Sequence, residues 1–156
     1  MNLKKLSAFL VDAKRNTYAA QRGTVPSSRL ESHDFAYERG PFRYLDSYVG
    51  EVRFSGEEVV WYEGRPIWSM NYYGRLLGPE PGPGFGDFLK RALLKVPESK
   101  PFRGPDDYGE GDYRFRQVFE GGTESLSGVE AFSGREEILY RDVAVYRLWF
   151  HGGLLS

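Results

Sequence analysis

The chain of 156 residues contains no cysteine, only two histidines and only two methionines. The absence of cysteine excludes disulfide bonds, thiolate metal sites and cysteine nucleophiles, and it is typical of a reducing compartment. A long apolar run is also missing. The N-terminal stretch MNLKKLSAFLVDAKRN is too charged for a signal peptide or a membrane span. We therefore expect a cytoplasmic protein with no membrane partner.

A large net charge of either sign is missing as well. The formal net charge is −1, so no basic field favours direct binding to nucleic acid. Aromatic residues, by contrast, make up 16% of the chain, with 11 tyrosines, 11 phenylalanines and 3 tryptophans. Because aromatic side chains favour both β-strands and ligand pockets, this excess predicts a strand-rich fold that offers a site to a small molecule.

Hydrophobic spacing changes along the chain and predicts helices and strands in order. Helical spacing is found in two segments, formed by Leu3, Leu6, Phe9, Leu10 and Ala13, and by Phe85, Phe88, Leu89, Ala92, Leu93 and Val96. The second helix is expected to end before Pro97. Alternating residues predict about four antiparallel strands between His33 and Gly74, with a turn at Glu63-Gly64, and further strands from Tyr113 onward, including a short one near 124–132.

The order of one helix followed by strands occurs twice, and the two copies align without a gap. At a shift of 78, eight identities fall in the 24 positions 54–77, among them Phe54 with Phe132. Upstream, the same shift pairs Phe35 with Tyr113. The alternative is convergence, because hairpins reuse glycine and aromatic residues. The shared frame across two hairpins favours duplication.

These observations predict the architecture. A linker rich in proline and glycine, near 78–87, separates the units 1–77 and 79–156. We expect a single α+β domain of two tandem helix-plus-antiparallel-strand repeats. The repeats are expected to form a pseudo-two-fold sheet or partial barrel with both helices packed on one face.

Strand parity sorts the residues of the last hairpin strand of each copy between the two faces of the sheet. The large apolar residues are expected to pack against the helices: Trp68, Met70, Tyr72, Tyr146, Leu148 and Phe150. The residues between them differ between the copies and are expected to meet in one groove: Ser69, Asn71, Tyr73, Arg147, Trp149 and His151. This groove is therefore the predicted place for a functional site.

Candidate ligand-binding residues follow from this face and from the strand before it. The predicted set is Glu57, Trp61, Ser69, Asn71, Tyr73, Arg147, Trp149 and His151. Glu58 and His151 are the candidates for a general acid or base, although a solvated glutamate and a half-buried strand end are the simpler interpretations. A buried Asp46 would need partners such as Arg43, Arg53 or a tyrosine hydroxyl, either in a structural network or to orient a ligand.

The sequence contains no motif that supports a metal or cofactor site. The two histidines form no metal triad, and the acidic stretch DDYGEGD, residues 106–112, lacks the spacing of a calcium-binding loop. A solvated turn is the expected structure of this stretch. We predict no metal and no cofactor.

The stretches DAKRNTYA, YLDSYVGEVRFSGEEVVWYEGRPIWSMNYYGR and FHGGLL resemble a bacterial domain family of unknown function, which occurs alone or behind helix-turn-helix domains of the XRE type. The resemblance implies a bacterial, cytoplasmic protein and a sensing role beside a transcription regulator, and it brings no site residues. The architecture is loosely similar to GyrI-like effector-binding domains, which is a fold-level analogy.

Three functions remain as hypotheses. The first is a small-molecule (effector) binding module whose aromatic groove between the half-sheets takes a flat or hydrophobic ligand, cations included. The second is a small hydrolase that uses Glu58 or His151 in the same groove. The third is a protein-interaction or homodimerisation domain with exposed aromatic residues at its surface.

Overall fold

A computed structural model describes residues 2–119 and 128–155. Two α-helices are present in the described residues, α1 (Leu3–Arg15) and α2 (Phe85–Leu93), with a short 3-10 helix η1 (Tyr18–Ala20). Helix α1 begins after Asn2, whose side chain accepts hydrogen bonds from the backbone N–H groups of Lys4 and Lys5. Both predicted helices are confirmed, but α2 ends at Leu93, before Val96, and its first residues fall within the predicted linker 78–87.

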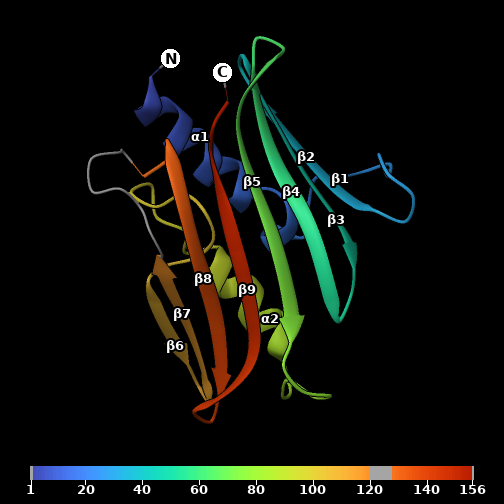
Figure 1. Ribbon diagram of the computed structural model, residues 1–156, viewed down its shortest axis with the longest axis vertical. Coiled ribbons are helices and arrows are strands. Elements are labelled where there is room, and N and C mark those ends of the chain that lie inside the picture. Colours follow the sequence, from blue (N-terminus) through green and yellow to red (C-terminus); the bar gives the residue numbers. More distant parts are fainter. Residues whose placement is uncertain (1, 120–127, 156) are drawn as a thin grey trace.

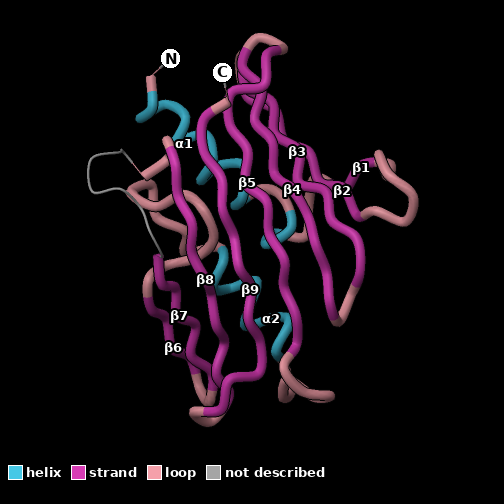
Figure 2. Tube along the Cα trace, in the orientation of Figure 1, coloured by secondary structure: helices cyan, strands magenta, loops and turns pink. Residues whose placement is uncertain are grey.

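Nine strands form one open antiparallel sheet in the described part of the chain (Figures 1 and 2). Their order is β1-β2-β3-β4-β5-β9-β8-β7-β6. The strands are β1 (Thr24–Val25), β2 (His33–Arg39), β3 (Phe42–Gly50), β4 (Arg53–Tyr62), β5 (Arg65–Leu76), β6 (Asp107–Glu110), β7 (Tyr113–Phe119), β8 (Ala131–Tyr140) and β9 (Val143–Leu154). The α+β class is confirmed, and the sheet is open rather than barrel-like, with β1 and β6 at its edges.

The strand predictions hold except at the two edges of the sheet. The four strands between His33 and Gly74 are present, and Glu63 and Gly64 both have positive φ, as a tight hairpin turn requires. Strands β1 and β6 were not expected. Of the predicted short strand near 124–132, positions 124–127 lie outside the described residues, 128–130 form a turn, and the last two positions belong to β8.

Both helices lie on the same face of the sheet, the inner face (Figure 1). Phe9 of α1 stacks on Phe42 of β3 at a ring-centroid distance of 4.8 Å, and Phe88 of α2 stacks on Tyr113 of β7 at the same distance. The predicted packed face is confirmed, because the six residues assigned to it are buried: Trp68, Met70, Tyr72, Tyr146, Leu148 and Phe150.

The two long hairpins share one register. Phe54 faces Gly74 across β4 and β5, and Phe132 faces Gly152 across β8 and β9, which is a shift of 78 for both residues. The register irregularity also recurs at this shift, between Val60 and Trp61 in β4 and between Ile138 and Leu139 in β8. We call β2–β5 the first half of the sheet and β6–β9 the second half.

Upstream of these hairpins, the predicted shift of 78 is wrong. Asp46 of β3 faces Glu58, and Gln117 of β7 faces Glu136, so the neighbouring strands match at a shift of 71. Phe35 therefore lies in β2, whereas Tyr113 lies in β7 at the position that Phe42 has in β3. The reason is the longer connection of the second half, which spans 120–130 where the first half has only 51–52.

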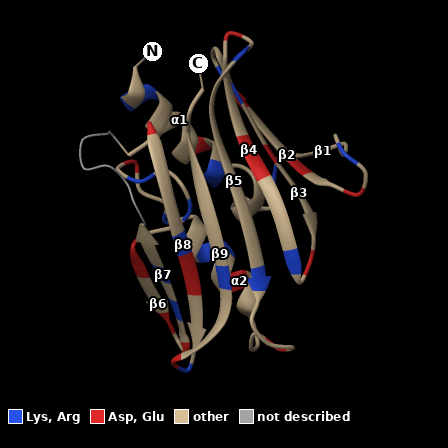
Figure 3. Ribbon diagram, in the orientation of Figure 1, with Lys and Arg blue, Asp and Glu red and all other residues tan. Residues whose placement is uncertain are grey.

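Charged residues of both signs are interspersed over the sheet (Figure 3). In the stretch DDYGEGD, Asp107 pairs with Arg114 and Glu110 with Arg91, while Asp112 pairs with Arg141. The described residues hold no cluster of metal-ligating side chains. Neither helix of the described chain has the length and apolarity that crossing a membrane would take.

Candidate functional site

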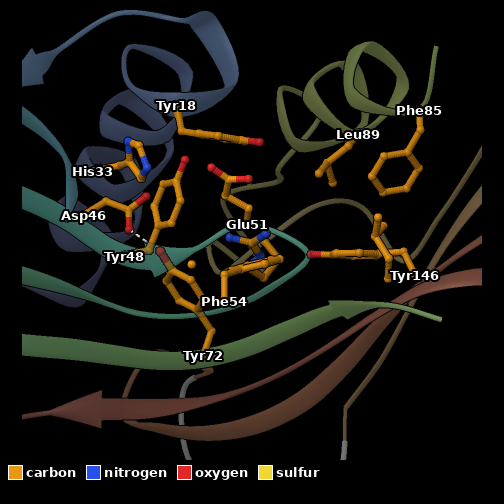
Figure 4. Close-up of a pocket in the computed structure, with 13 residues that line it drawn as sticks. Tyr18, His33, Asp46, Tyr48, Glu51, Phe54, Tyr72, Phe85, Leu89 and Tyr146 are labelled. Atoms are coloured by element: carbon orange, nitrogen blue, oxygen red, sulfur yellow. Dashed lines mark hydrogen bonds between the residues drawn. The ribbon is translucent and has the colours of Figure 1, made fainter. Parts of the chain in front are cut away.

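A cavity of about 380 Å³ lies between the helices and the inner face of the sheet (Figure 4). Strands of both halves, η1, α2 and the segment after α2 all contribute to its walls. The lining residues are Tyr18, His33, Asp46, Tyr48, Gly50, Glu51, Phe54, Tyr72, Leu76, Phe85, Leu89, Arg103 and Tyr146. Six of these thirteen residues are tyrosine or phenylalanine, so aromatic surface dominates the cavity.

A buried polar contact in the cavity joins Tyr72 and Asp46. The Tyr72 hydroxyl donates a hydrogen bond of 2.6 Å to Asp46 Oδ1 (Figure 4). Tyr72 is on β5 and Asp46 on β3, so the tyrosine ring crosses the intervening strand β4 at Gly56. A Cβ at Gly56 would come within 2.4 Å of Tyr72 Cζ, and the absence of a side chain there makes this contact feasible.

Two buried ion pairs lie beside Asp46 on the inner face. Lys14 of α1 pairs with Glu58, whose side chain is 2% exposed. Arg103 binds Glu136 through two hydrogen bonds of 3.0 Å, and the Tyr146 hydroxyl donates a third of 2.9 Å to the same carboxylate. Buried charges are tolerated when they are paired and hydrogen-bonded in this way.

Asp46 is the buried acidic group beside these two ion pairs that belongs to neither of them. Its residue is 6% exposed, and no cation forms an ion pair with it among the residues that the structure describes. Burial, together with the neighbouring Glu58 carboxylate, raises the pKa of Asp46 to about 7, against the opposing effects of Tyr72, Lys14 and Arg103. The carboxyl group is therefore poised to gain or lose a proton near neutral pH.

The tyrosines around this carboxyl group are neutral hydrogen-bonding groups. Burial raises the pKa of Tyr48 to about 12. Burial, followed by the charge of Asp46, also raises the pKa of Tyr72 well above its ordinary range, and burial and Glu136 do the same for Tyr146. The phenol groups therefore keep their protons at neutral pH and can donate hydrogen bonds.

The mouth of the cavity lies at the tight β3–β4 turn. Gly50 has φ of +91°, and a Cβ there would come within 2.2 Å of the Arg53 carbonyl oxygen, so the turn depends on glycine. The exposed Glu51 follows it in the turn and lines the cavity. His33, also exposed, lies with its ring 5.0 Å from that of Tyr48.

The matching region of the second half has no counterpart of the Asp46 carboxyl group and is occupied mainly by phenylalanine rings. At the positions that Asp46, Tyr48 and Tyr72 have in the first half, the second half has Gln117, Phe119 and Phe150. Phe102 occupies this region and stacks on Phe132 at 3.9 Å, with Phe119 in edge contact at 5.7 Å. The fold itself thus accepts an uncharged amide and two phenyl rings where the first half carries an acid and two phenols.

Most of the predicted ligand-binding residues lie on the opposite, outer face of the sheet. Glu57, Asn71 and His151 form one row across β4, β5 and β9, and Tyr73 stacks on Trp149 at 6.4 Å in the next row. Trp61, Ser69 and Arg147 also alternate with the buried inner-face residues, and Arg147 pairs with Glu137. The structure gathers these residues on one face, as predicted, but that face does not border the cavity.

The two candidate acid–base residues are separated by the sheet. Glu58 is on the inner face and is engaged by Lys14, so the expectation of a solvated glutamate is wrong. The Glu58 side chain is 2% exposed, so this carboxylate is shielded from water. His151 is exposed on the outer face. These two side chains therefore cannot act on one substrate.

Sequence reasoning missed several cavity residues. Tyr18, Glu51, Phe85, Leu89 and Arg103 come from a 3-10 helix, a turn, a helix and an irregular segment, whose spatial proximity no local pattern encodes. One signal was present: Asp46 is a polar residue within an aromatic strand. The expectation that a tyrosine hydroxyl would satisfy it is confirmed by Tyr72.

Comparison with known families adds one finding to this geometry. Residues 46–155 match a family described as a domain of unknown function, DUF5680. The chain belongs to the DUF5680 family. The DUF5680 match begins at Asp46 and includes eleven of the thirteen cavity residues, all except Tyr18 and His33. No curated protein and no solved structure matches the chain.

Proposed function

We propose that this DUF5680 protein is a small-molecule-binding module and that its ligand occupies the cavity between the helices and the sheet. The observation that carries the proposal is the cavity of about 380 Å³, with its aromatic walls and the buried Asp46. Ligand sites in proteins are typically concave and mainly apolar, with a few polar groups that orient the ligand. Asp46, Tyr48 and Tyr72 provide such groups.

The contrast between the two halves supports this proposal. We infer that the halves arose by duplication, because two hairpins share register and irregularity at a shift of 78 and the adjoining strands match at 71. In the second half the corresponding volume is filled by phenylalanine side chains. Packing alone therefore does not require the carboxyl group and the phenol groups of the first half, which favours a functional role for them.

The effector role predicted from the sequence fits the same cavity. A bacterial, cytoplasmic sensing module beside a transcription regulator is what the resemblance implies, and a cavity of about 380 Å³ suits the sensing of a metabolite-sized molecule. The acid–base roles of Glu58 and His151, the ligand contacts on the outer face and the homodimer stay predictions from the sequence.

A cavity-filling substitution tests the proposal. Leu76 lines the cavity, so Leu76→Trp is expected to fill part of it and to weaken ligand binding more than tenfold. The measurement is a fragment screen by ligand-observed NMR on the native protein. The hits are then titrated into the native protein, into Leu76→Trp and into the control variant Leu154→Trp.

Leu154 provides the matched control. It takes the position in β9 that Leu76 has in β5, and it lies outside the cavity lining. Leu154→Trp is expected to leave hit affinities within about twofold of the native values. Hits that bind equally well to Leu76→Trp, or a screen that yields no hits, would contradict the proposed function.

A further inference from the structure

We propose that the cavity selects an organic cation, an amine with an apolar or aromatic body whose ammonium group pairs with Asp46. This inference rests on the proposed function and specifies its ligand class. It depends on three features of the described residues: the balance of buried charges, the chemistry of the cavity walls, and the position of a second acidic group at the mouth.

The balance of buried charges leaves a negative site. Lys14 is engaged by Glu58, and Arg103 is engaged by Glu136 in two-point geometry. Among the described side chains, Tyr72 alone donates a hydrogen bond to the Asp46 carboxyl group, at Oδ1. An ionised carboxylate with no cation partner is costly to bury, so a cationic ligand gains affinity by relieving that cost.

The walls around Asp46 suit a cation. The Tyr72 ring already has the Arg103 guanidinium over its face at 5.4 Å, which shows that this aromatic surface accepts positive charge. Tyr18, Tyr48 and Phe54 present further aromatic surface to the same cavity. Aromatic faces attract ammonium and guanidinium groups, more strongly where water is excluded.

A second acidic group, Glu51, lies at the mouth of the cavity. Glu51 is exposed there and pairs with no cation among the described residues. An incoming cation would thus meet Glu51 first and Asp46 at the inner end. An anionic ligand would meet two acidic groups, and the one arginine in the lining is already bound to Glu136.

Proton release accompanies cation binding in this arrangement. The groups that face Asp46 are Glu58 from β4, Tyr72 from β5, Lys14 from α1, Tyr18 from η1 and Arg103 from the segment after α2, with Tyr44 and Tyr48 beside it on β3. Since the pKa of Asp46 is about 7 in the free protein, the site is mainly protonated at pH 6 and mainly ionised at pH 8. Cation affinity should rise about tenfold over this interval, because binding requires the ionised form.

Three soluble probes with the same ring separate charge from shape. Phenethylamine is cationic, 2-phenylethanol is neutral and 3-phenylpropionate is anionic at pH 8. We expect the native protein to bind the amine at least tenfold more tightly than the alcohol and the anion weakest. The measurement is titration followed by two-dimensional NMR of the full chain.

The Asp46→Asn variant identifies the group responsible. It should bring the affinities for amine and alcohol within about threefold of each other and abolish the pH dependence, while circular dichroism shows a retained fold. If it does not fold, Tyr72→Phe provides a second test, because loss of the hydrogen bond should shift the pH at which amine binding rises.

The outcomes distinguish this inference from the proposed function. Equal binding of amine and alcohol by the native protein, with both weakened in Leu76→Trp, would overturn the cation preference and leave the cavity as a ligand site. Preference for the anion, or binding of none of the three probes, would also overturn it. Amine binding that persists in Leu76→Trp would instead contradict the cavity as the site of binding.

Discussion

Asp46 carries a carboxyl group that the charges around it do not neutralise, and this has a consequence for stability. Its pKa is about 7 in the folded protein, above the ordinary value of 3.8. Between these two values an unfolded chain has released the proton whereas the folded protein retains it. The folded state then binds more protons, so stability falls as pH rises.

We therefore predict a decline in the free energy of unfolding between about pH 4 and pH 7 that Asp46→Asn removes. The contribution of Asp46 is present in full below pH 4 and is lost as pH rises through 7, with an upper limit of about 4 kcal/mol. Urea unfolding at several pH values, compared between the native protein and the variant, measures the difference.

The control is Asp112→Asn, which alters an exposed acidic group paired with Arg141. It should leave the pH dependence of stability close to that of the native protein in this interval. An Asp46→Asn profile parallel to the native one from pH 4 to pH 7 would show that the proton is not retained in the folded state.

Single residues were only partly predictable. The sequence placed Asp46 within an aromatic strand and left Arg43, Arg53 or a tyrosine hydroxyl as its possible partners, and the structure shows the tyrosine Tyr72 in that position. Glu58 was expected to be solvated because most strand glutamates are. Its burial depends on Lys14, 44 residues earlier in the chain, and no local pattern reports such a pair.

At the scale of elements, two glycines allow an aromatic ring on one strand to lie across the neighbouring strand. Tyr72 lies over Gly56, and Phe150 lies over Gly134 in the same manner. A Cβ would come within 2.4 Å of Tyr72 Cζ at the first position and within 2.5 Å of Phe150 Cζ at the second. Each glycine therefore determines the direction of the aromatic side chain on the next strand.

We predict that Gly56→Ala and Gly134→Ala lower stability by similar amounts, about 1–3 kcal/mol, through overpacking. Their effects on ligand binding should differ. Gly56→Ala displaces Tyr72 from Asp46 and should weaken binding of phenethylamine, whereas Gly134→Ala displaces only an apolar ring. Urea unfolding and NMR titration give the two quantities, and equal weakening of binding by both variants would refute this assignment.

The elements themselves were largely predictable, because their residues repeat at helical or strand spacing. The missed strands β1 and β6 have only two and four residues, too few to display a period of two. The predicted shift of 78 failed upstream of the long hairpins for a different reason. A longer connection in the second half changes the shift from 78 to 71, and a gapless comparison cannot follow an insertion.

For the whole molecule, the central pairing of β5 with β9 decides whether the two halves unfold together. This pairing extends from Trp68 with Leu154 to Leu76 with Tyr146. Phe85 of α2 also contacts Tyr146, and the cavity has walls from both halves. The halves are thus joined by both a long strand pair and a shared interior.

We predict one cooperative unfolding transition. Hydrogen exchange should be slowest in β5 and β9, and fastest in the edge strands β1 and β6, because edge strands have fewer backbone partners. Mass spectrometry of peptides from each strand provides the measurement. Complete exchange of one half while the other stays protected would show that the halves are independent units.

The whole-molecule layout followed from the sequence in outline, with the α+β class and helices on one face. The position of the cavity did not. Parity correctly sorted the residues between the faces, but the apolar face was assumed to be filled by the helices. Helix α1 packs near β3 and α2 near β7, and two helices of 13 and 9 residues leave space between them.

Phe102 gives this family a route to new specificity. Its ring stacks on Phe132 and fills in the second half the volume that stands open in the first. A relative with a small residue at this position would gain a second chamber without rebuilding any strand. Under the proposed function, one chamber could then keep its ligand while the other took a second, so that a single chain bound two ligands at once.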